Sequence, residues 1–148
     1  PDAICLGRDS ADLEKPEACA AAIADYAPSV VINAAAFTAV DRAEREEALA
    51  TRINADAPAA MARACATAKI PLVHISTDYV FDGSGNAPFS PDEATGPLGA
   101  YGRSKLTGEQ AIRDSGATYA ILRTAWVFSA HGGNFLKTML RLSETRDV

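Results

Sequence analysis

The sequence has 148 residues, of which 48% are hydrophobic and 22% are charged, as expected for one ordinary globular domain. The net charge of −5 and the isoelectric point near 5.0 argue against nucleic acid or an anionic membrane as the main partner. The longest apolar run, residues 30–40, is too short to span a bilayer. Three scattered cysteines lack metal-ligand spacing, so we expect reduced thiols, a cytoplasmic setting and no metal site.

Short apolar runs rich in β-branched residues predict four strands, at residues 3–6, 30–33, 70–75 and 119–122. Helical stretches lie between them. An alanine-rich helix is expected from Pro16 to about Tyr26, another before Gly116, and a last one from about Phe135. This alternation predicts an α/β fold, a doubly wound parallel sheet of the Rossmann-like kind.

The region after Asp41 is helical by its pattern. Its apolar residues recur every four positions, which indicates a stripe facing the core rather than a cofactor site: Leu49, Ile53, Ala57, Met61 and Cys65. Asn54 or Asp56 can cap a new helix with Pro58 in its first turn, so we expect a break here and two separate helices.

Polar clusters follow the predicted strands, at residues 8–12, 33–38, 76–79 and 123–126. In parallel α/β sheets, ligands bind beyond the carboxyl ends of the strands, so these clusters mark the expected site. Ala34, Ala35 and Ala36 carry almost no side chain at such an end. They allow either the close approach of a flat ligand or simple packing against a helix, and the sequence leaves both readings open.

Tyr101 and Lys105 lie four residues apart near the start of a predicted helix, which places them on one face. A nearby cation lowers the pKa of a phenol, so Lys105 is expected to make Tyr101 a proton donor or acceptor near neutral pH. Taken alone, such a pair is usually a solvated helix face.

Four segments carry a resemblance to a known family, namely residues 31–41 (VINAAAFTAVD), 76–83 (STDYVFDG), 101–105 (YGRSK) and 123–127 (RTAWV). Together they resemble the extended short-chain dehydrogenase/reductases and, within these, the dTDP-4-dehydrorhamnose reductase family. The resemblance implies reduction of the 4-keto group of dTDP-4-dehydro-L-rhamnose by NADPH, with NADH also open, giving dTDP-L-rhamnose.

The resemblance also implies the catalytic residues, which are Thr77, Tyr101 and Lys105. Hydride arriving at a carbonyl carbon leaves negative charge on the oxygen. Thr77 can donate a hydrogen bond to that oxygen, Tyr101 can deliver the proton, and Lys105 can bind the nicotinamide ribose.

Cofactor contacts implied in the same way are Asp12 and Leu13 near the adenine, Ala35, Ala36 and Thr38 along the cofactor or substrate, and Ser76, Tyr101 and Lys105 near the nicotinamide. Implied substrate contacts are Thr77, Asp78, Tyr79, Tyr101 and Trp126. The alternative for Trp126 is a core position.

Arg8 suits a ribose 2′-phosphate, which favours NADPH, whereas the neighbouring Asp9 and Asp12 keep NADH open. We interpret His74 as a buried structural residue and His131 as an unremarkable loop residue.

The sequence departs from the family pattern because it contains no Gly-x-x-Gly-x-x-Gly loop and no carboxy-terminal substrate-binding part. We therefore interpret residues 1–148 as a partial NAD(P)-binding Rossmann-like domain from the interior of a longer protein. The first strand of the family is expected between the strands at 3–6 and 70–75, so its absence predicts a gap in the sheet. Direct pairing of the strands at 30–33 and 70–75 is one way to close that gap.

Two other functions are compatible with the sequence. One is a non-catalytic dinucleotide-binding module that regulates a partner, although such a module has no need of Thr77, Tyr101 and Lys105 together. The other is a nucleotide-sugar epimerase or dehydratase, although a dehydratase would want an acidic pair where Asp78 is followed by Tyr79. The expected partner is a dTDP-deoxysugar, and the protein could form a homo-oligomer.

Overall fold

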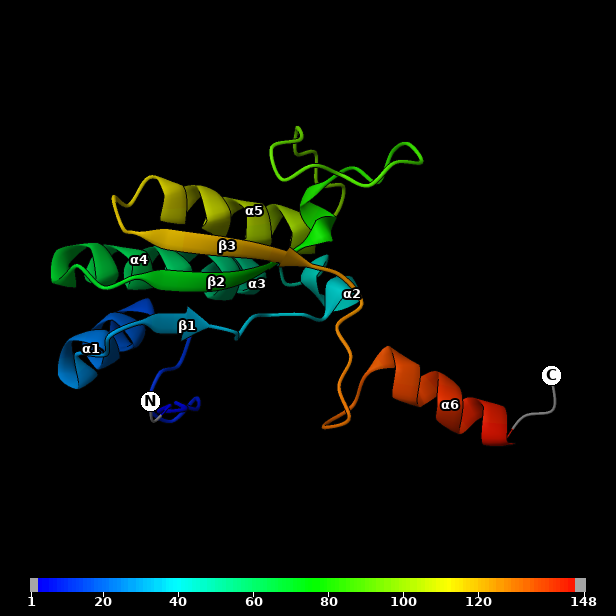
Figure 1. Cartoon of the computed structure of the whole chain (residues 1–148), viewed down its shortest axis with the longest axis horizontal. Coiled ribbons are helices and arrows are strands. Elements are labelled where there is room, and N and C mark those ends of the chain that lie inside the picture. Colours follow the sequence, from blue (N-terminus) through cyan, green and yellow to red (C-terminus); the bar gives the residue numbers. More distant parts are fainter. Residues whose placement is uncertain (1–2, 146–148) are drawn as a thin grey trace.

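A computed structural model describes residues 3–145. The elements alternate along the chain (Figure 1). In order they are α1 (Pro16–Tyr26), β1 (Val31–Asn33), α2 (Val40–Ala43), α3 (Glu47–Thr51), a π-helical turn (Arg52–Asp56), α4 (Ala57–Ala68), β2 (Leu72–Thr77), a 3₁₀ turn (Asp78–Val80), α5 (Ala100–Arg113), β3 (Tyr119–Thr124) and α6 (Phe135–Thr145).

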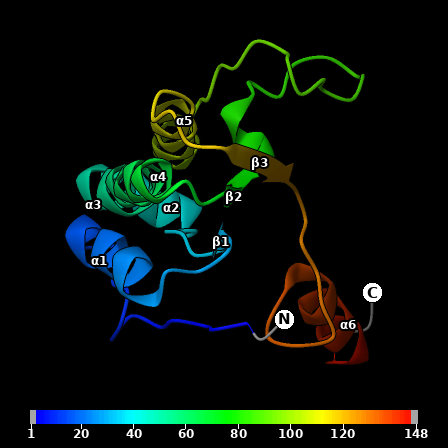
Figure 2. The same ribbon diagram turned by 60° about the vertical axis from the view of Figure 1, so that its left-hand side comes forward.

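The three strands form one parallel sheet in the order β1-β2-β3, with Val31 opposite Leu72 and Leu72 opposite Tyr119. Helices α1, α4 and α5 lie side by side against one face of this sheet, while α6 lies apart from it (Figures 1 and 2). The other face carries exposed apolar side chains such as Ile32 and Leu122. The fold is thus an incomplete Rossmann-like α/β sheet, as the alternation predicts.

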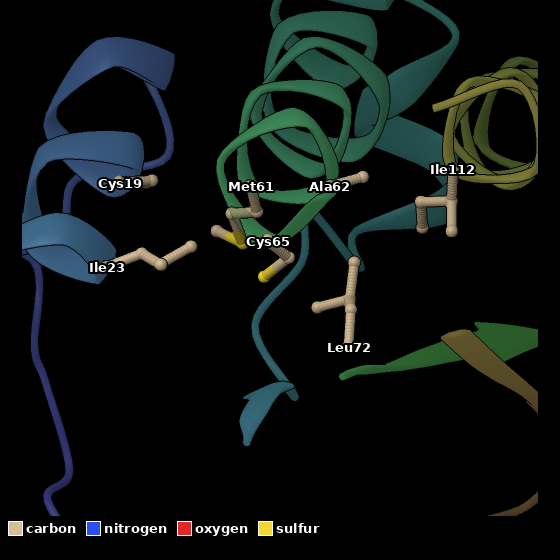
Figure 3. Packing of buried hydrophobic residues seen from close by; sticks show 7 residues of the cluster. All are labelled: Cys19, Ile23, Met61, Ala62, Cys65, Leu72 and Ile112. Atoms are coloured by element: carbon tan, nitrogen blue, oxygen red, sulfur yellow. The ribbon is translucent and has the colours of Figure 1, made fainter. Parts of the chain in front are cut away.

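The main core lies between α1, α4 and the sheet (Figure 3). Its buried side chains come from two helices, from β2 and from the end of α5: Cys19, Ile23, Met61, Ala62, Cys65, Leu72 and Ile112. The four-residue stripe is confirmed as a core stripe, because Leu49 is half-buried and its other four members are buried.

The predicted strand at residues 3–6 is wrong. This segment has no regular structure, and Ile4 and Leu6 are 65% and 39% exposed. A strand forms only where a neighbouring strand completes its hydrogen bonds. Among the described residues β1 and β3 are the edge strands, and residues 3–6 pair with neither.

The predicted gap beside the strand at 70–75 is also wrong. The β1 strand pairs directly with β2, from Val31 opposite Leu72 to Asn33 opposite His74. The sheet is therefore continuous, by the pairing that we considered as one way to close it.

The expected break near Asn54 does not occur. The helix runs from α3 through the π-helical turn into α4, and the Asn54 side chain caps no helix. Instead its amide binds both backbone groups of Phe37 and the hydroxyl of Ser104. Asn54 therefore lies inside the helix, and the interruption falls at residues 44–46, between α2 and α3. No helix in residues 3–145 has the length and apolar character needed to cross a membrane.

Candidate active site

The carboxyl end of β2 and the amino end of α5 meet and bring two predicted site residues together. Thr77 ends β2, and Tyr101 is the second residue of α5. The rings of Tyr79 and Tyr101 pack edge to face with their centroids 5.5 Å apart. A Cβ on Gly102 would lie 2.2 Å from the Tyr79 carbonyl oxygen, so only glycine lets α5 approach this closely. Thr77 and Tyr101 are therefore neighbours, as expected, and the close approach of α5 to the turn after β2 depends on Gly102.

Thr77 is buried, and its hydroxyl is held by the turn that follows β2. It accepts a hydrogen bond from the backbone N–H of Tyr79 at 3.2 Å and donates one to the Asp78 carboxylate at 3.2 Å. This fixes the hydroxyl at the strand end. Asp78 and Tyr79 themselves are exposed beside it, where a bound ligand can reach them.

The expected sign of the Tyr101 pKa shift is wrong. Burial raises the pKa of Tyr101 above its usual value. Hydrogen bonding with Thr77 acts in the opposite direction without cancelling this, and the nearby Asp78 and Tyr79 raise the pKa further. Tyr101 thus keeps its proton at neutral pH.

Lys105 does not act on Tyr101 as a free cation, because its amine is anchored to the sheet. The side chain is 1% exposed. Its Nζ donates to the Ile75 carbonyl oxygen at 2.7 Å and lies 3.1 Å from His74 Nε2. Burial lowers the pKa of Lys105 to about 8, against the opposing charge of Glu109. The amine therefore titrates within reach of physiological pH.

His74 lies fully buried between β1 and α5, which agrees with our interpretation of it as a buried residue. Its Nδ1 is 3.1 Å from Asn33 Nδ2, and its Nε2 faces Lys105. Burial, together with the charge of Lys105, lowers the pKa of His74 to about 3, although Glu109 acts in the opposite direction. The imidazole is therefore neutral at any physiological pH. Its contact with Lys105 was not predicted from the sequence.

The loop after β1 runs along the same edge of the sheet. Ala35 and Thr38 are exposed, Ala36 is half-buried and Phe37 is buried. Exposure of Ala34 and Ala35 rules out helix packing for these two alanines and leaves room for a ligand.

Asn54 ties this loop to α5. Its Oδ1 accepts from the Phe37 N–H at 2.8 Å, and its Nδ2 donates to the Phe37 carbonyl and to Ser104 Oγ, each at 3.0 Å. Asn54 was missed as a site residue, because its partners lie 17 and 50 positions away in the sequence.

Leu13 and Asp12 precede α1. Leu13 is half-buried against the main core and against a second cluster around Phe37, on which Tyr101 also packs. The Asp12 carboxylate accepts from the Glu14 N–H at 3.1 Å. Both residues therefore lie on the side of the molecule that carries the loop after β1. Arg8 is exposed and lies 3.7 Å from Glu14.

Ser76 faces the helical layer. Its hydroxyl donates to the buried Glu109 carboxylate at 2.6 Å, and its carbonyl accepts from Thr124 Oγ1 at 3.1 Å. Glu109 also binds Arg123, so these residues form a buried polar network that the sequence did not reveal. The Ser76 side chain is thus occupied beneath the sheet rather than turned toward a ligand.

Trp126 follows β3 and is 73% exposed, so the alternative of a core tryptophan is wrong. Its backbone has a positive φ of 52°, which is uncommon for a large side chain. The ring packs edge-on against Phe135 at the start of α6, with centroids 4.7 Å apart. The structure therefore does not bring Trp126 onto Tyr101.

In residues 3–145, no group of three or more His, Cys, Asp or Glu side chains is placed to hold a metal ion.

A parallel Rossmann-like sheet with a threonine at a strand end and a Tyr-x-x-x-Lys pair on the next helix defines the class of extended short-chain dehydrogenase/reductase-like proteins. Within that class the family model described as "RmlD substrate binding domain" matches residues 2–148, and the chain belongs to this family.

Relatives of known structure or name agree with this placement. The chain is 46% identical, over 97% of its own length and 49% of the relative's, to a dTDP-4-dehydrorhamnose reductase of Sinorhizobium fredii. It superposes on the dTDP-4-dehydrorhamnose reductase of Clostridium acetobutylicum with a TM-score of 0.92 and 40% identity, covering 97% of this chain and 51% of that one. A Bacillus anthracis dTDP-4-dehydrorhamnose reductase, solved in complex with NADP, gives a TM-score of 0.91 and 35% identity, with 96% and 50% covered. The chain thus spans about half the length of these relatives.

Proposed function

We propose that this chain supplies the acid–base side chains of an NAD(P)H-dependent ketoreductase, which reduces the 4-keto group of dTDP-4-dehydro-L-rhamnose to dTDP-L-rhamnose in the cytoplasm. One observation carries the proposal: Thr77 and a protonated Tyr101 stand together at the carboxyl end of β2, while Lys105 is anchored one turn further along α5. The relatives named above are reductases for this sugar nucleotide, which supports the choice of substrate.

The chemistry assigned to each side chain follows from its position. As the carbonyl carbon of the sugar accepts hydride, its oxygen becomes negative. When the sugar is bound, the Thr77 hydroxyl turns its one O–H from the Asp78 carboxylate to that oxygen, and the Tyr101 hydroxyl transfers its proton to it. Asp78, Tyr79 and Trp126 are exposed and are assigned to the sugar and its nucleotide.

Reduced nicotinamide, NADPH or NADH, supplies the hydride when it is bound. The exposed alanines after β1 leave a smooth edge on which a flat ring system can lie, so the residues present fit such a cofactor. We assign contacts along the cofactor to Ala35, Ala36 and Thr38, and contacts with its adenine to Asp12 and Leu13. Lys105 and Tyr101 are assigned to the nicotinamide ribose, with Ser76 contributing through its backbone. The NADP complex of the Bacillus anthracis relative favours NADPH. On this assignment residues 1–148 form part of an NAD(P)-binding domain.

The test uses the native polypeptide that contains residues 1–148, incubated with the dTDP-4-keto-6-deoxysugar and NADPH. We expect stoichiometric loss of the near-ultraviolet absorbance of reduced nicotinamide and formation of dTDP-L-rhamnose. Tyr101→Phe should lower turnover by roughly 10²–10⁴-fold, the usual contribution of a positioned acid. Tyr119→Phe, on the exposed surface of β3, is the matched control and should keep turnover unchanged.

Other outcomes identify the competing functions. NADPH binding without oxidation, in the presence of the sugar, would indicate a regulatory dinucleotide-binding module. A changed sugar without net oxidation of NADPH would indicate an epimerase or a dehydratase. Turnover that survives Tyr101→Phe would overturn the assignment of the acid.

A further inference from the structure

The first turn of α5 carries Tyr101, yet the residue before this helix provides no side-chain cap. That residue is Gly99, which has no side chain to accept a hydrogen bond from the helix amides. Ala100, the first residue of α5, is 0% exposed. Its backbone N–H therefore needs an acceptor from elsewhere in the protein.

The acceptor is Glu44, which lies 56 positions earlier in the sequence. Its Oε1 accepts from the Ala100 N–H at 2.7 Å, the short distance expected of a hydrogen bond to a charged group. A carboxylate is favourable here because the amino end of a helix carries partial positive charge. Glu44 lies between α2 and α3, and both of these helices contact α5. It therefore caps α5 from a different part of the fold.

Gly99 makes room for this carboxylate. A Cβ on Gly99 would lie 2.8 Å from Glu44 Oε1, which is closer than such atoms normally approach. The Gly99 backbone is extended, with φ −109° and ψ 163°, so its conformation does not call for glycine. Space for the Glu44 carboxylate is thus the constraint that the structure places on residue 99.

A second glutamate reaches the same turn of α5 at the surface. Glu47 Oε1 accepts from Arg103 Nε at 2.9 Å, and Arg103 Nη1 donates to the Leu98 carbonyl at 3.1 Å. Both side chains of this ion pair are nearly half exposed, and exposed pairs contribute little stability. Glu44 is therefore the stronger restraint, because its partner is a buried amide.

We propose that Glu44 is a positioning residue, which holds the first turn of α5 so that the Tyr101 hydroxyl stays beside Thr77. Tyr101 directly follows Ala100, so a shift of the Ala100 backbone moves the phenol with it. The proposal rests on the proposed ketoreductase function for its effect on turnover. Misplacement of a reacting group by about 1 Å can lower a rate by about 10²-fold.

The test compares Glu44→Ala with Glu44→Gln in the native polypeptide that contains residues 1–148. Glutamine keeps an oxygen acceptor at the same reach, whereas alanine leaves the Ala100 N–H without one. We expect Glu44→Ala to lower kcat for reduction roughly 10–100-fold with KM little changed, because the acid is misplaced while substrate binding is kept. Glu44→Gln should recover most of the rate. An equal loss in both variants, or a loss confined to KM, would overturn the proposal.

Glu46→Ala is the matched control. Glu46 belongs to the same segment between α2 and α3, but its carboxylate pairs at 2.7 Å with Arg42 on the surface. Its removal should leave kcat unchanged. A fall as large as that of Glu44→Ala would assign the effect to the charge of the segment and contradict the role given to Glu44.

Gly99→Ala tests the same contact while Glu44 stays in place. The added methyl group should displace the carboxylate from the Ala100 N–H and lower kcat as Glu44→Ala does. Combining the two substitutions should lower kcat no further than Glu44→Ala alone, because the displaced group is already absent. Multiplied losses in the double variant would contradict the proposal.

Two readouts do not require turnover. Hydrogen exchange at the Ala100 amide should accelerate in Glu44→Ala but not in Glu44→Gln. The NMR signals of the Tyr101 ring, assigned with Tyr101→Phe in protein labelled with ¹³C-tyrosine, should shift in Glu44→Ala. The shift is expected because this ring packs edge to face on Tyr79 with the centroids 5.5 Å apart.

These readouts separate the two proposals. If both change in a protein whose wild type does not reduce the sugar nucleotide, the proposed function fails while the role of Glu44 in placing Tyr101 stands. If the wild type reduces the sugar nucleotide, and folded Glu44→Ala keeps its kcat and its Tyr101 signals, the role of Glu44 fails alone.

Discussion

The guanidinium of Arg123 on β3 binds both carboxylate oxygens of Glu109 on α5, at 3.0 and 2.7 Å. Glu109 is fully buried, whereas the Arg123 side chain is 14% exposed. The arginine also lies 4.8 Å over the ring of Phe81 and donates to the Pro91 carbonyl at 3.1 Å. This one side chain thus joins the sheet, α5 and the long loop that precedes α5.

Arg123→Met should destabilise the protein by about 3–5 kcal/mol, because it leaves a buried carboxylate without its main partner. The measurement is the free energy of unfolding in urea at neutral pH. Arg113→Met is the matched control, since Arg113 reaches Glu109 at 3.3 Å from a 48% exposed position and should cost at most about 1 kcal/mol. Equal losses in the two variants would contradict the role given to Arg123.

The Arg123–Glu109 pair predicts that the free energy of unfolding depends on pH. Burial by itself raises the pKa of Glu109, but hydrogen bonds from Arg123 and Ser76 and the charges of both arginines outweigh it and hold the pKa below its usual value. The stabilisation is therefore present above the pKa of an unfolded glutamate, about 4.3, and is lost as the pH falls through the lower folded value. In Arg123→Met the pKa of Glu109 should instead lie above its unfolded value, because a buried carboxyl without its main partner prefers its protonated form. The stability gap between wild type and variant should shrink on acidification, and a gap independent of pH would contradict this.

Two glycines of α5 should resist substitution because neighbouring backbone lies against them. A Cβ on Gly102 would lie 2.2 Å from the Tyr79 carbonyl oxygen, and one on Gly108 would lie 2.1 Å from that of Asn54. Either alanine variant must push α5 outward, with an expected cost of about 1–3 kcal/mol or more in unfolding free energy. Gly7→Ala meets no atom within 4 Å and should be neutral, so a neutral Gly102→Ala would refute the close approach.

Much of the helical layer could be predicted because its signals are local. Pro16 opens α1, and the four-residue stripe from Leu49 faces the core as expected. The strand at 3–6 was mispredicted because a strand depends on a partner edge that its own residues do not specify. The direction of the pKa shift of Tyr101 was mispredicted because the effect of burial outweighed that of charge, and burial depends on the tertiary structure. Proximity of Thr77 to Tyr101 was predictable from motif order. The contacts of His74 with Asn33 and Lys105 could not be predicted, although His74 lies in phase with the buried Leu72 and Ser76 along β2.

Asn54→Ala should loosen the loop that carries Ala35, Ala36 and Thr38. It removes three hydrogen bonds and leaves the N–H and carbonyl of buried Phe37 unpaired, at about 1–3 kcal/mol for each group. Hydrogen exchange at the Phe37 amide should accelerate strongly while amides of the distant β3 change little. Ser104→Ala is the matched control, since it removes one of the three bonds and leaves both Phe37 groups paired. Equal acceleration in the two variants would show that the loop does not depend on Asn54.

Lys105 should make stability rise on the alkaline side of neutrality. Its pKa is about 8 in the folded protein and 10.5 when unperturbed, so between these values the unfolded chain holds more protons than the folded one. The free energy of unfolding therefore increases with pH in this window, by roughly 3 kcal/mol in full, at 1.36 kcal/mol per pKa unit. Lys105→Met has no titrating group at this position, and Lys105→Arg keeps its charge throughout the window. Wild type should gain stability relative to both as the pH rises from about 8 to 10.5, in urea titrations at matched ionic strength. Parallel pH curves for all three proteins would mean that the folded state does not depress the pKa of Lys105.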